Sequence, residues 1–288
     1  MSSRDYVLYS LVIFGWSTSW LPLKGQAGLV GPEVSVLWRF AIAAALCFLL
    51  ASLQGLKLRF ALQLHLRFAA LGLLIFSTNF TLFYYASPHL ASGLLAVVFS
   101  TASMMNILMV AGLTRTAPPF RQLVASAIGL GGIVLIFLPE LQLSSQALPA
   151  LLLCIAGTLC FCAGNQVSAA LQKQNIPVMS ANSWGMVYGC VVLVVYALFM
   201  GNPFIIDDRL AYLSGLVWLA VFSSVLTFAC YLTLVGRIGA GKAGYATVIF
   251  PVFALLISTA FERYQWGVLP AVGIFLVITG NMLMLRSR

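Results

Sequence analysis

Long apolar runs alternate along the chain with short breaks of polar residues, Gly or Pro. A helix needs roughly 20 apolar residues to cross a hydrocarbon core about 30 Å thick, and ten of the runs are close to that length. We expect the first run to be retained as a helix, because no small-residue cleavage site follows it. The predicted spans are residues 6–23, 34–53, 67–86, 91–113, 122–138, 148–171, 180–200, 211–234, 243–261 and 267–285.

The composition agrees with the apolar runs. Of 288 residues, 62% are hydrophobic and only 7% are charged, and the mean hydropathy is +1.04. A soluble domain carries about 25% charged residues. Because the spans use nearly all of the chain, they leave no room for a soluble catalytic domain. We therefore predict an all-α integral membrane protein with ten transmembrane helices.

The basic residues are divided unequally between the two sides that ten spans would define. With both termini on one side, eleven of the 15 basic residues fall there, and only Lys24, Arg39, Arg209 and Arg263 fall on the other side. Basic loops stay in the cytoplasm, so both termini are predicted to be cytoplasmic. The side of the termini receives Arg4, Lys57, Arg59, Arg67, Arg115, Arg121, Lys173, Arg237, Lys242, Arg286 and Arg288.

The second half of the chain repeats features of the first. FSTNFTLFYYA (76–86) shares four positions with FSSVLTFACYL (222–232) at an offset of 146, and GLLAVVF (93–99) shares three with GYATVIF (244–250) at 151. Five spans is an odd number, so the second copy enters the membrane from the opposite face. Secondary transporters use such inverted repeats to expose one central cavity to each side in turn. The expected repeats are residues 1–142 and 143–288.

Small, weakly polar residues form a stripe on several predicted spans. On the fourth span, Ser100 and Ser103 share one helical face, with Phe99 and Asn106 beside them. One interpretation is close helix packing, in which hydroxyls bond to other helices or to their own backbone. The other is the wall of a cavity, which we favour because close packing does not require large aromatic and amide side chains there.

Three further residues extend the candidate site. Pro251, in mid-span, leaves the Thr247 carbonyl for another partner, which is water, the Thr247 hydroxyl or a substrate. Trp16 lies deeper than Trp20, which we expect in the interfacial aromatic belt. The Asn165 amide needs a partner on another helix or on a ligand. The candidate substrate-binding residues are Trp16, Ser77, Thr81, Tyr84, Phe99, Ser100, Ser103, Asn165, Thr227, Thr247 and Pro251.

Charged residues are missing from the centres of the spans. No Asp or Glu lies within a predicted span, and His65 and His89 are expected in loops. A charge at the bilayer centre costs about 3 kcal/mol, so the cavity should suit a neutral or zwitterionic solute, without a buried carboxylate for proton coupling. Intramembrane proteases need paired aspartates, a Ser/His pair or HExxH, so we do not expect an enzyme, a metal site or a cofactor.

Three segments carry a family resemblance: WSTSWLPLK (16–24), ASGLLAVVFSTASMMNILM (91–109) and KAGYATVIFPVFALLIS (242–258). With these segments and its ten predicted spans, the chain resembles the EamA-type drug/metabolite transporter superfamily, and most of all its YddG-type amino-acid exporters. The resemblance implies export of neutral amino acids, including aromatic ones, across a bacterial inner membrane. It also implies a central cavity lined by the first, third, fourth, sixth, eighth and ninth spans.

The expected partners are a small-molecule substrate and membrane lipid, with no nucleic acid, and the expected functional unit is a monomer. Two alternatives stay open. The chain could export other small hydrophobic metabolites or drugs, or it could belong to another class, as a structural or assembly protein of the membrane.

Overall fold

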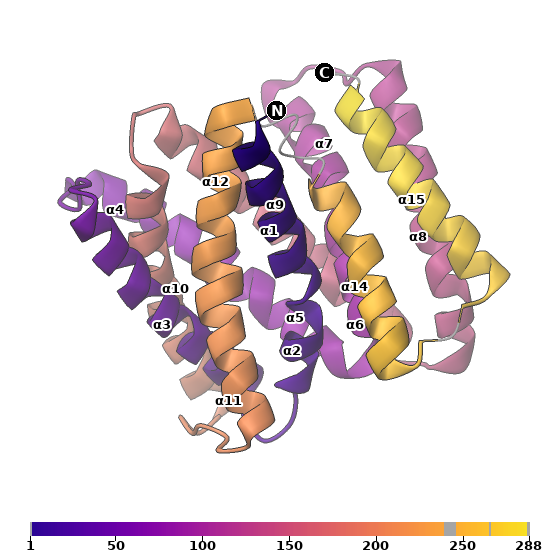
Figure 1. Cartoon of the computed structure of the whole chain (residues 1–288), viewed down its shortest axis with the longest axis horizontal. Coiled ribbons are helices and arrows are strands. Elements are labelled where there is room, and N and C mark those ends of the chain that lie inside the picture. The colour runs from indigo at the N-terminus through magenta and orange to yellow at the C-terminus, as the bar shows by residue number, and fades with distance from the viewer. Residues whose placement is uncertain (1, 239–245, 265, 287–288) are drawn as a thin grey trace.

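The computed structural model describes residues 2–238, 246–264 and 266–286, and every regular element within them is helical. Figure 1 shows how the helices pack into one bundle. The α-helices are α1 (Ser3–Ser17), α2 (Trp20–Gly25), α3 (Pro32–Leu53), α4 (Leu62–Leu71), α5 (Phe80–Ala86), α6 (Ser92–Ser100), α7 (Ala102–Thr114), α8 (Phe120–Leu143), α9 (Ala147–Gln172), α10 (Val178–Met200), α11 (Leu210–Val217), α12 (Thr227–Ile238), α14 (Ala246–Glu262) and α15 (Val268–Arg286). Two π-helical stretches, η1 (Gly72–Asn79) and η3 (Trp218–Leu226), and the 3-10 turn η2 (Ser87–His89) complete the described elements.

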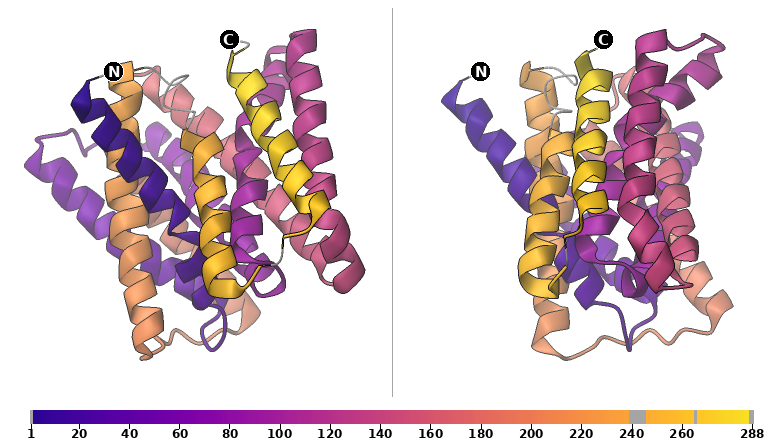
Figure 2. Two further views of the ribbon diagram at one scale, coloured as in Figure 1. Left: turned by 45° about the vertical axis from the view of Figure 1, so that its right-hand side comes forward. Right: turned by 90° about the vertical axis from the view of Figure 1, so that its right-hand side faces the viewer.

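The helices are long and apolar enough for a membrane protein. Among the described residues, seven helical stretches could cross a bilayer by length and hydropathy, and Val248–Glu262 and Val268–Leu283 are shorter apolar helices. Large apolar side chains such as Leu159, Val195 and Phe199 are exposed on the outside of the bundle, where lipid would cover them. Both chain ends lie at the same end of the bundle (Figures 1 and 2). Each predicted span contains helix, and the number of crossings stays a prediction.

The first predicted span consists of two helices rather than one. Helix α1 ends at Ser17 and α2 begins at Trp20. Thr18 Oγ1 donates to the Phe14 carbonyl oxygen at 2.7 Å, and hydroxyls that bond to the backbone in this way bend or end helices. Pro22 adds to the break because it has no N–H to donate to the carbonyl four residues earlier.

Three other predicted spans are irregular. The fourth breaks between α6 and α7 at Thr101, whose Oγ1 donates to the Val98 carbonyl oxygen at 2.6 Å. The third and eighth contain the π-helical stretches η1 and η3, which begin at Gly72 and Trp218 and so keep the separation of the sequence repeat. Irregular backbone at membrane depth is tolerated where protein buries it or where it lines a cavity, and π-helical turns are frequent at functional sites.

Spans that correspond in the two halves pack on each other. Helix α3 contacts α10, α6 contacts α14, and α8 contacts α15. Figure 1 shows α8 and α15 side by side at one edge of the bundle, with α3, α4 and α10 gathered at the other. An added Cβ on Gly132 would lie 2.5 Å from the Gly273 carbonyl oxygen, so α8 and α15 approach this closely only because both positions are glycine. This pairing agrees with two related halves, whose boundaries stay a prediction.

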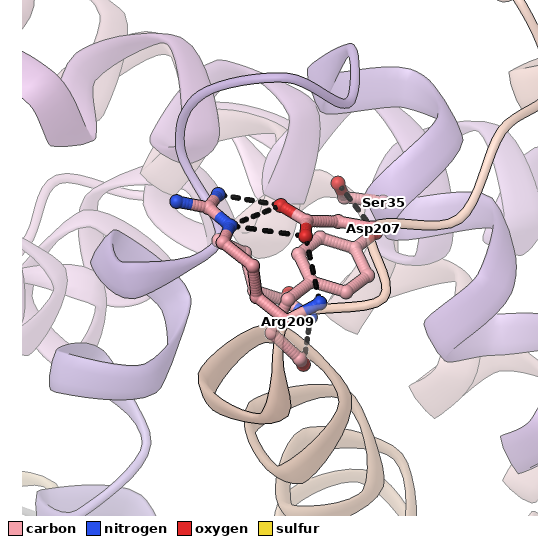
Figure 3. A network of polar contacts seen from close by, with 5 residues as sticks. Ser35, Asp207 and Arg209 are labelled. Carbon is pink, nitrogen blue, oxygen red and sulfur yellow. Dashed lines mark hydrogen bonds and ion pairs between the residues drawn. The ribbon is translucent and has the colours of Figure 1, made fainter.

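Figure 3 shows polar contacts at the start of α11, both within the loop before it and between α11 and α3. Asp207 is 5% exposed and accepts from the backbone N–H of Arg209 at 2.9 Å and from its guanidinium. These bonds to Arg209 hold the pKa of Asp207 below its ordinary value. The hydroxyls of Tyr212 and Ser35 lie 2.9 Å apart and join α11 to α3. The contacts therefore position α11 at the end of the bundle opposite the termini.

Several side chains that we expected outside the spans belong to helical elements. His65 lies in α4, Glu33 lies in the first turn of α3, and Glu262 is the last residue of α14. Glu33 is only 1% exposed, and it accepts hydrogen bonds from the Tyr85 hydroxyl and from Asn202 Nδ2. The helices extend past the apolar runs because neighbouring elements supply donors to these carboxylates.

Candidate functional site

A cavity lies where the interrupted spans meet. Its volume is about 50 Å³, counting the space in which the centre of a water-sized sphere can lie. A single water molecule needs about 10–15 Å³ of such space. There is thus room for more than one water or for part of a small solute. The lining residues are Trp16, Ser19, Trp20, Leu23, Arg39, Asn79, Phe80, Phe83, Phe99, Phe161, Ser223, Phe228 and Phe250. They come from both halves of the chain.

Aromatic rings form most of the cavity wall. The Trp20 and Phe250 rings are nearly parallel, with centroids 6.4 Å apart, and Phe99 lies 4.8 Å from Phe161. Trp16 meets Phe228 edge-on at 5.8 Å. Offset and edge-to-face pairs of this kind are favourable by about 0.5–1.5 kcal/mol each beyond their buried area. The wall is therefore apolar and suited to an aromatic or aliphatic group.

The main polar feature of the wall is Arg39, which the polar stripes do not single out. It lies within α3 and is 2% exposed. Its Nε donates to Ser224 Oγ at 3.0 Å and its Nη2 to Ser223 Oγ at 3.4 Å, so the guanidinium is held by η3. Its Cζ lies 4.3 Å from the centre of the Phe80 ring. The available signal was a lone Arg inside an apolar run, which marks a functional residue by default.

Asn79, at the end of η1, is the second polar feature that the stripes do not mark. It is 1% exposed, and neither atom of its amide has a hydrogen-bond partner within the described part of the chain. A buried amide without partners costs about 1–3 kcal/mol. Asn79 lines the cavity, and the protein leaves both the donor and the acceptor of its amide unused within the described residues.

The chain matches the model of the EamA-like transporter family twice, over residues 5–138 and 148–286. It belongs to that family. This assigns it to the multi-pass membrane transporters.

Similar proteins agree with this assignment. The chain is 22% identical to protein PagO of Salmonella typhimurium, over 98% of this chain and 95% of PagO. It is 26% identical to an uncharacterized transporter, YyaM, of Bacillus subtilis, over 89% and 85%. One crystal structure superposes with a TM-score of 0.66 over 99% of this chain and 98% of that one, at 14% identity. That likeness supports the fold.

In this EamA-like transporter, two residues predicted for the site, Trp16 and Phe99, line the cavity. Trp20 lines it too, although we expected Trp20 in the interfacial belt. It is 9% exposed, and its ring packs 5.3 Å from Phe83 and 5.6 Å from Phe99. The reason is the break in the first span, which starts a new helix at Trp20 and places this ring against α5 and α6.

Hydroxyls predicted for the site bond to their own helices. Ser77 Oγ donates to the Leu73 carbonyl oxygen at 2.8 Å, and Thr227 Oγ1 donates to the Phe222 carbonyl oxygen at 2.6 Å. Ser77 lies within η1 and Thr227 directly follows η3, and neither is in the cavity wall. They satisfy carbonyls of the irregular turns.

Three more predicted site residues are buried or half-buried outside the cavity wall. The Tyr84 hydroxyl donates to Gln26 Oε1 at 2.6 Å and ties α5 to the end of α2. Thr81 is buried, with no partner for its hydroxyl among the described residues. Asn165 is half-buried on α9. None of the three is in the cavity wall, and their contact with substrate stays a prediction.

The stripe on the fourth span faces α15. Ser103 Oγ donates to Asn281 Oδ1, and Asn281 Nδ2 donates to Ser100 Oγ at 3.4 Å. Ser100 and Pro251 line a smaller second cavity of about 10 Å³, which is largely apolar. The side chain of Thr247 lies outside the described residues. In this conformation the stripe thus joins helices, and its contact with substrate stays a prediction.

Proposed function

We propose that this protein exports neutral amino acids, including aromatic ones, through the central cavity by alternating access, in the inner membrane of a bacterium. The observation that carries the proposal is the aromatic cavity at the breaks of the first, third, fourth and eighth spans. In secondary transporters, solutes bind at discontinuous helices between two inverted repeats. The direction of transport rests on the sequence resemblance.

The wall has features that suit an amino acid. Rings such as Trp16, Trp20 and Phe99 offer faces to an apolar side chain or to an ammonium group. Arg39 and Asn79 offer donors to a carboxylate. All of these residues belong to one chain, so we propose that a monomer is the functional unit.

A second candidate is export of other small hydrophobic metabolites or drugs. The aromatic character of the lining favours it, because such a wall binds apolar groups without regard to an amino-acid backbone. Lipophilic compounds without a carboxylate would then compete for the cavity.

The test is counterflow in proteoliposomes that contain the purified protein. Liposomes are loaded with one unlabelled amino acid, and uptake of labelled phenylalanine is followed. We expect neutral amino acids to drive uptake, with aromatic ones the most effective and acidic or basic ones ineffective. Failure of every amino acid, together with competition by lipophilic compounds, would contradict the proposal and support the second candidate.

Direction needs a separate measurement in cells. Bacteria that express the chain are preloaded with a phenylalanine-containing dipeptide, which they hydrolyse internally, and phenylalanine in the medium is measured. We expect faster release than from cells that carry the vector alone. Equal release would contradict export.

A further inference from the structure

Arg39 is a buried charge without a buried counter-ion. The described residues form three ion pairs, Lys24–Glu262, Arg209–Asp207 and Arg237–Asp5, and none involves Arg39. Removing an ionised group from water costs several kcal/mol, which a protein normally offsets with an opposite charge. The partners of Arg39 are instead neutral hydroxyls and ring faces.

One N–H₂ group of the Arg39 guanidinium makes no hydrogen bond within the described residues. Ser224 and Ser223 occupy Nε and Nη2, whereas Nη1 has no hydrogen-bond partner in the described part of the chain. The Tyr84 hydroxyl interacts with the guanidinium, but it gives its proton to Gln26 and is uncharged. Arg39, a residue of the cavity wall, is thus oriented by η3 while one of its N–H₂ groups has no hydrogen-bond partner among the described residues.

Packing of the helices does not require this charge. Under the sequence offset of 146, the position in the second half that corresponds to Arg39 is Gly185. Gly185 lies against the Phe76 ring of η1, where an added Cβ would be 2.9 Å from a ring carbon. The contact of α10 with η1 therefore has an apolar pair where the corresponding contact of α3 with η3 has Arg39.

Asn79 brings a second unsatisfied donor into the same wall. Its amide is buried and unpartnered, and the residue that follows it, Phe80, is the ring beneath the guanidinium. Asn79 and Arg39 therefore belong to one part of the cavity. An arginine together with an amide recognises a carboxylate well, because charge-assisted hydrogen bonds are about twice as strong as neutral ones.

The cavity offers no matching site for a positive charge. Every residue in its wall is aromatic, aliphatic, Ser, Asn or Arg, and no Asp or Glu is among them. An ammonium group would find ring faces and the neutral oxygens of Ser and Asn side chains, and would be repelled by Arg39. The carboxylate of a substrate therefore has an opposite charge in the wall, whereas its amino group has none.

We propose that Arg39 and Asn79 bind the carboxylate of an aromatic carboxylate substrate, and that the cavity does not require the amino group. The inference rests on the proposed function, because it takes this cavity to be the place where substrate binds. It adds that the carboxylate is the group of the substrate that the protein recognises. Aromatic amino acids then belong to a wider class that includes their des-amino analogues.

The test compares three ligands that differ by one group: phenylalanine, 3-phenylpropionate without the amino group, and phenethylamine without the carboxylate. Binding to the purified full chain is followed through tryptophan fluorescence, since Trp16 and Trp20 line the cavity. We expect 3-phenylpropionate to bind at least as tightly as phenylalanine, and phenethylamine to bind at least about tenfold more weakly. Equal affinity for phenethylamine, or no binding of 3-phenylpropionate, overturns the inference.

Two substitutions separate recognition from folding. Arg39→Gln and Asn79→Leu should each weaken 3-phenylpropionate binding at least about tenfold. Phenethylamine binding should tighten in Arg39→Gln, because the charge that repels its ammonium group is removed. Because Asn79→Leu removes an unpartnered buried amide, it should keep or raise the unfolding temperature without ligand. Arg39→Lys should restore only part of the affinity, since it keeps the charge and loses the guanidinium fork. Unchanged 3-phenylpropionate affinity in both Arg39→Gln and Asn79→Leu overturns the inference.

The outcomes also separate this inference from the proposed function. Phenylalanine counterflow that is unaffected by Arg39→Gln would leave amino-acid transport standing and overturn the carboxylate site. Binding of 3-phenylpropionate that depends on Arg39, with no phenylalanine counterflow, would overturn amino-acid transport and support the carboxylate site.

Discussion

Lys24 Nζ lies 2.7 Å from Glu262 Oε1, so an ion pair joins α2 to the last turn of α14. The Glu262 carboxylate also accepts from the backbone N–H of Ser92 at 2.9 Å and from Ser258 Oγ at 2.7 Å. One carboxylate therefore holds the first, fourth and ninth spans together, at the end of the bundle opposite the termini (Figure 2). Opening of the cavity toward that end would require these contacts to separate.

Reversal of either charge in this pair should slow transport. A pair of this exposure is worth about 1 kcal/mol, which is about fivefold in an equilibrium. We expect Lys24→Glu and Glu262→Lys each to lower the initial counterflow rate about fivefold, because like charges destabilise the closed end. The double reversal should recover part of the rate, since it restores the opposite charges but not the hydrogen bonds that Glu262 accepts from Ser92 and Ser258. If the fold reduction in the counterflow rate of the double variant equals the product of the two single reductions, the pair does not control opening.

Transport should require an aromatic ring at position 16, but not the indole N–H group of Trp16. It contacts the Phe228, Tyr231 and Phe250 rings at centroid distances of 5.0–5.9 Å. Trp16→Ala should lower counterflow at least about tenfold, since several ring contacts of about 0.5–1.5 kcal/mol are lost, whereas Trp16→Phe should stay within about threefold. Trp266→Ala is the control, because that ring is 44% exposed and is not in the cavity wall. Equal rates for Trp16→Ala and Trp266→Ala would remove Trp16 from the substrate path.

Two adjacent glycines of α8 should respond oppositely to substitution by alanine. An added Cβ on Gly132 would meet the Gly273 backbone, whereas one on Gly131 would meet no atom within 4 Å. Gly132→Ala should destabilise the protein by about 1–3 kcal/mol through overpacking, and Gly131→Ala should be neutral or slightly stabilising. Thermal unfolding in detergent measures both. Similar unfolding temperatures for the two variants would show that α8 and α15 are not in close contact.

Acid should weaken the contact between the start of α1 and the end of α12. Asp5 Oδ2 accepts from the Ser2 backbone N–H at 2.7 Å, and Oδ1 accepts from Arg237 Nε at 2.6 Å. The bond to the Ser2 backbone, followed by that to Arg237, lowers the pKa of Asp5 from its ordinary 3.8 to about 2. Because the folded-state pKa lies below the unfolded one, Asp5 stabilises the fold above about pH 4, and this contribution is lost as the pH falls toward 2.

The measurement compares unfolding temperatures of the wild type and Asp5→Asn between pH 6 and pH 2. We expect the wild type to be more stable at pH 6 and the difference to shrink below pH 4. Arg237→Gln should reduce the difference without removing it, since the bond from Ser2 remains. A constant difference over the whole range would contradict a role for the Asp5 charge.

The amino-acid sequence alone established where the helices lie and to which family the chain belongs. Helix follows the predicted spans closely, although it begins five residues before the third and ends five residues after the fifth, and residues 243–245 of the ninth lie outside the described residues. The apolar spans are helical because backbone polar groups in lipid must bond within their own segment. The family follows from the order of the spans and from segments such as those at 16–24 and 91–109.

Only the tertiary structure decided which side chains face the cavity. A stripe at 100° per residue assumes an unbroken α-helix, and a break at Trp20 or a π-helical turn before Asn79 rotates the residues that follow out of that register. The hydropathy pattern places Arg39 only within the second span, whereas η3 of the other half supplies the hydroxyls that hold it in the wall. Hydropathy describes each segment by itself, whereas this cavity is made by segments far apart in the chain.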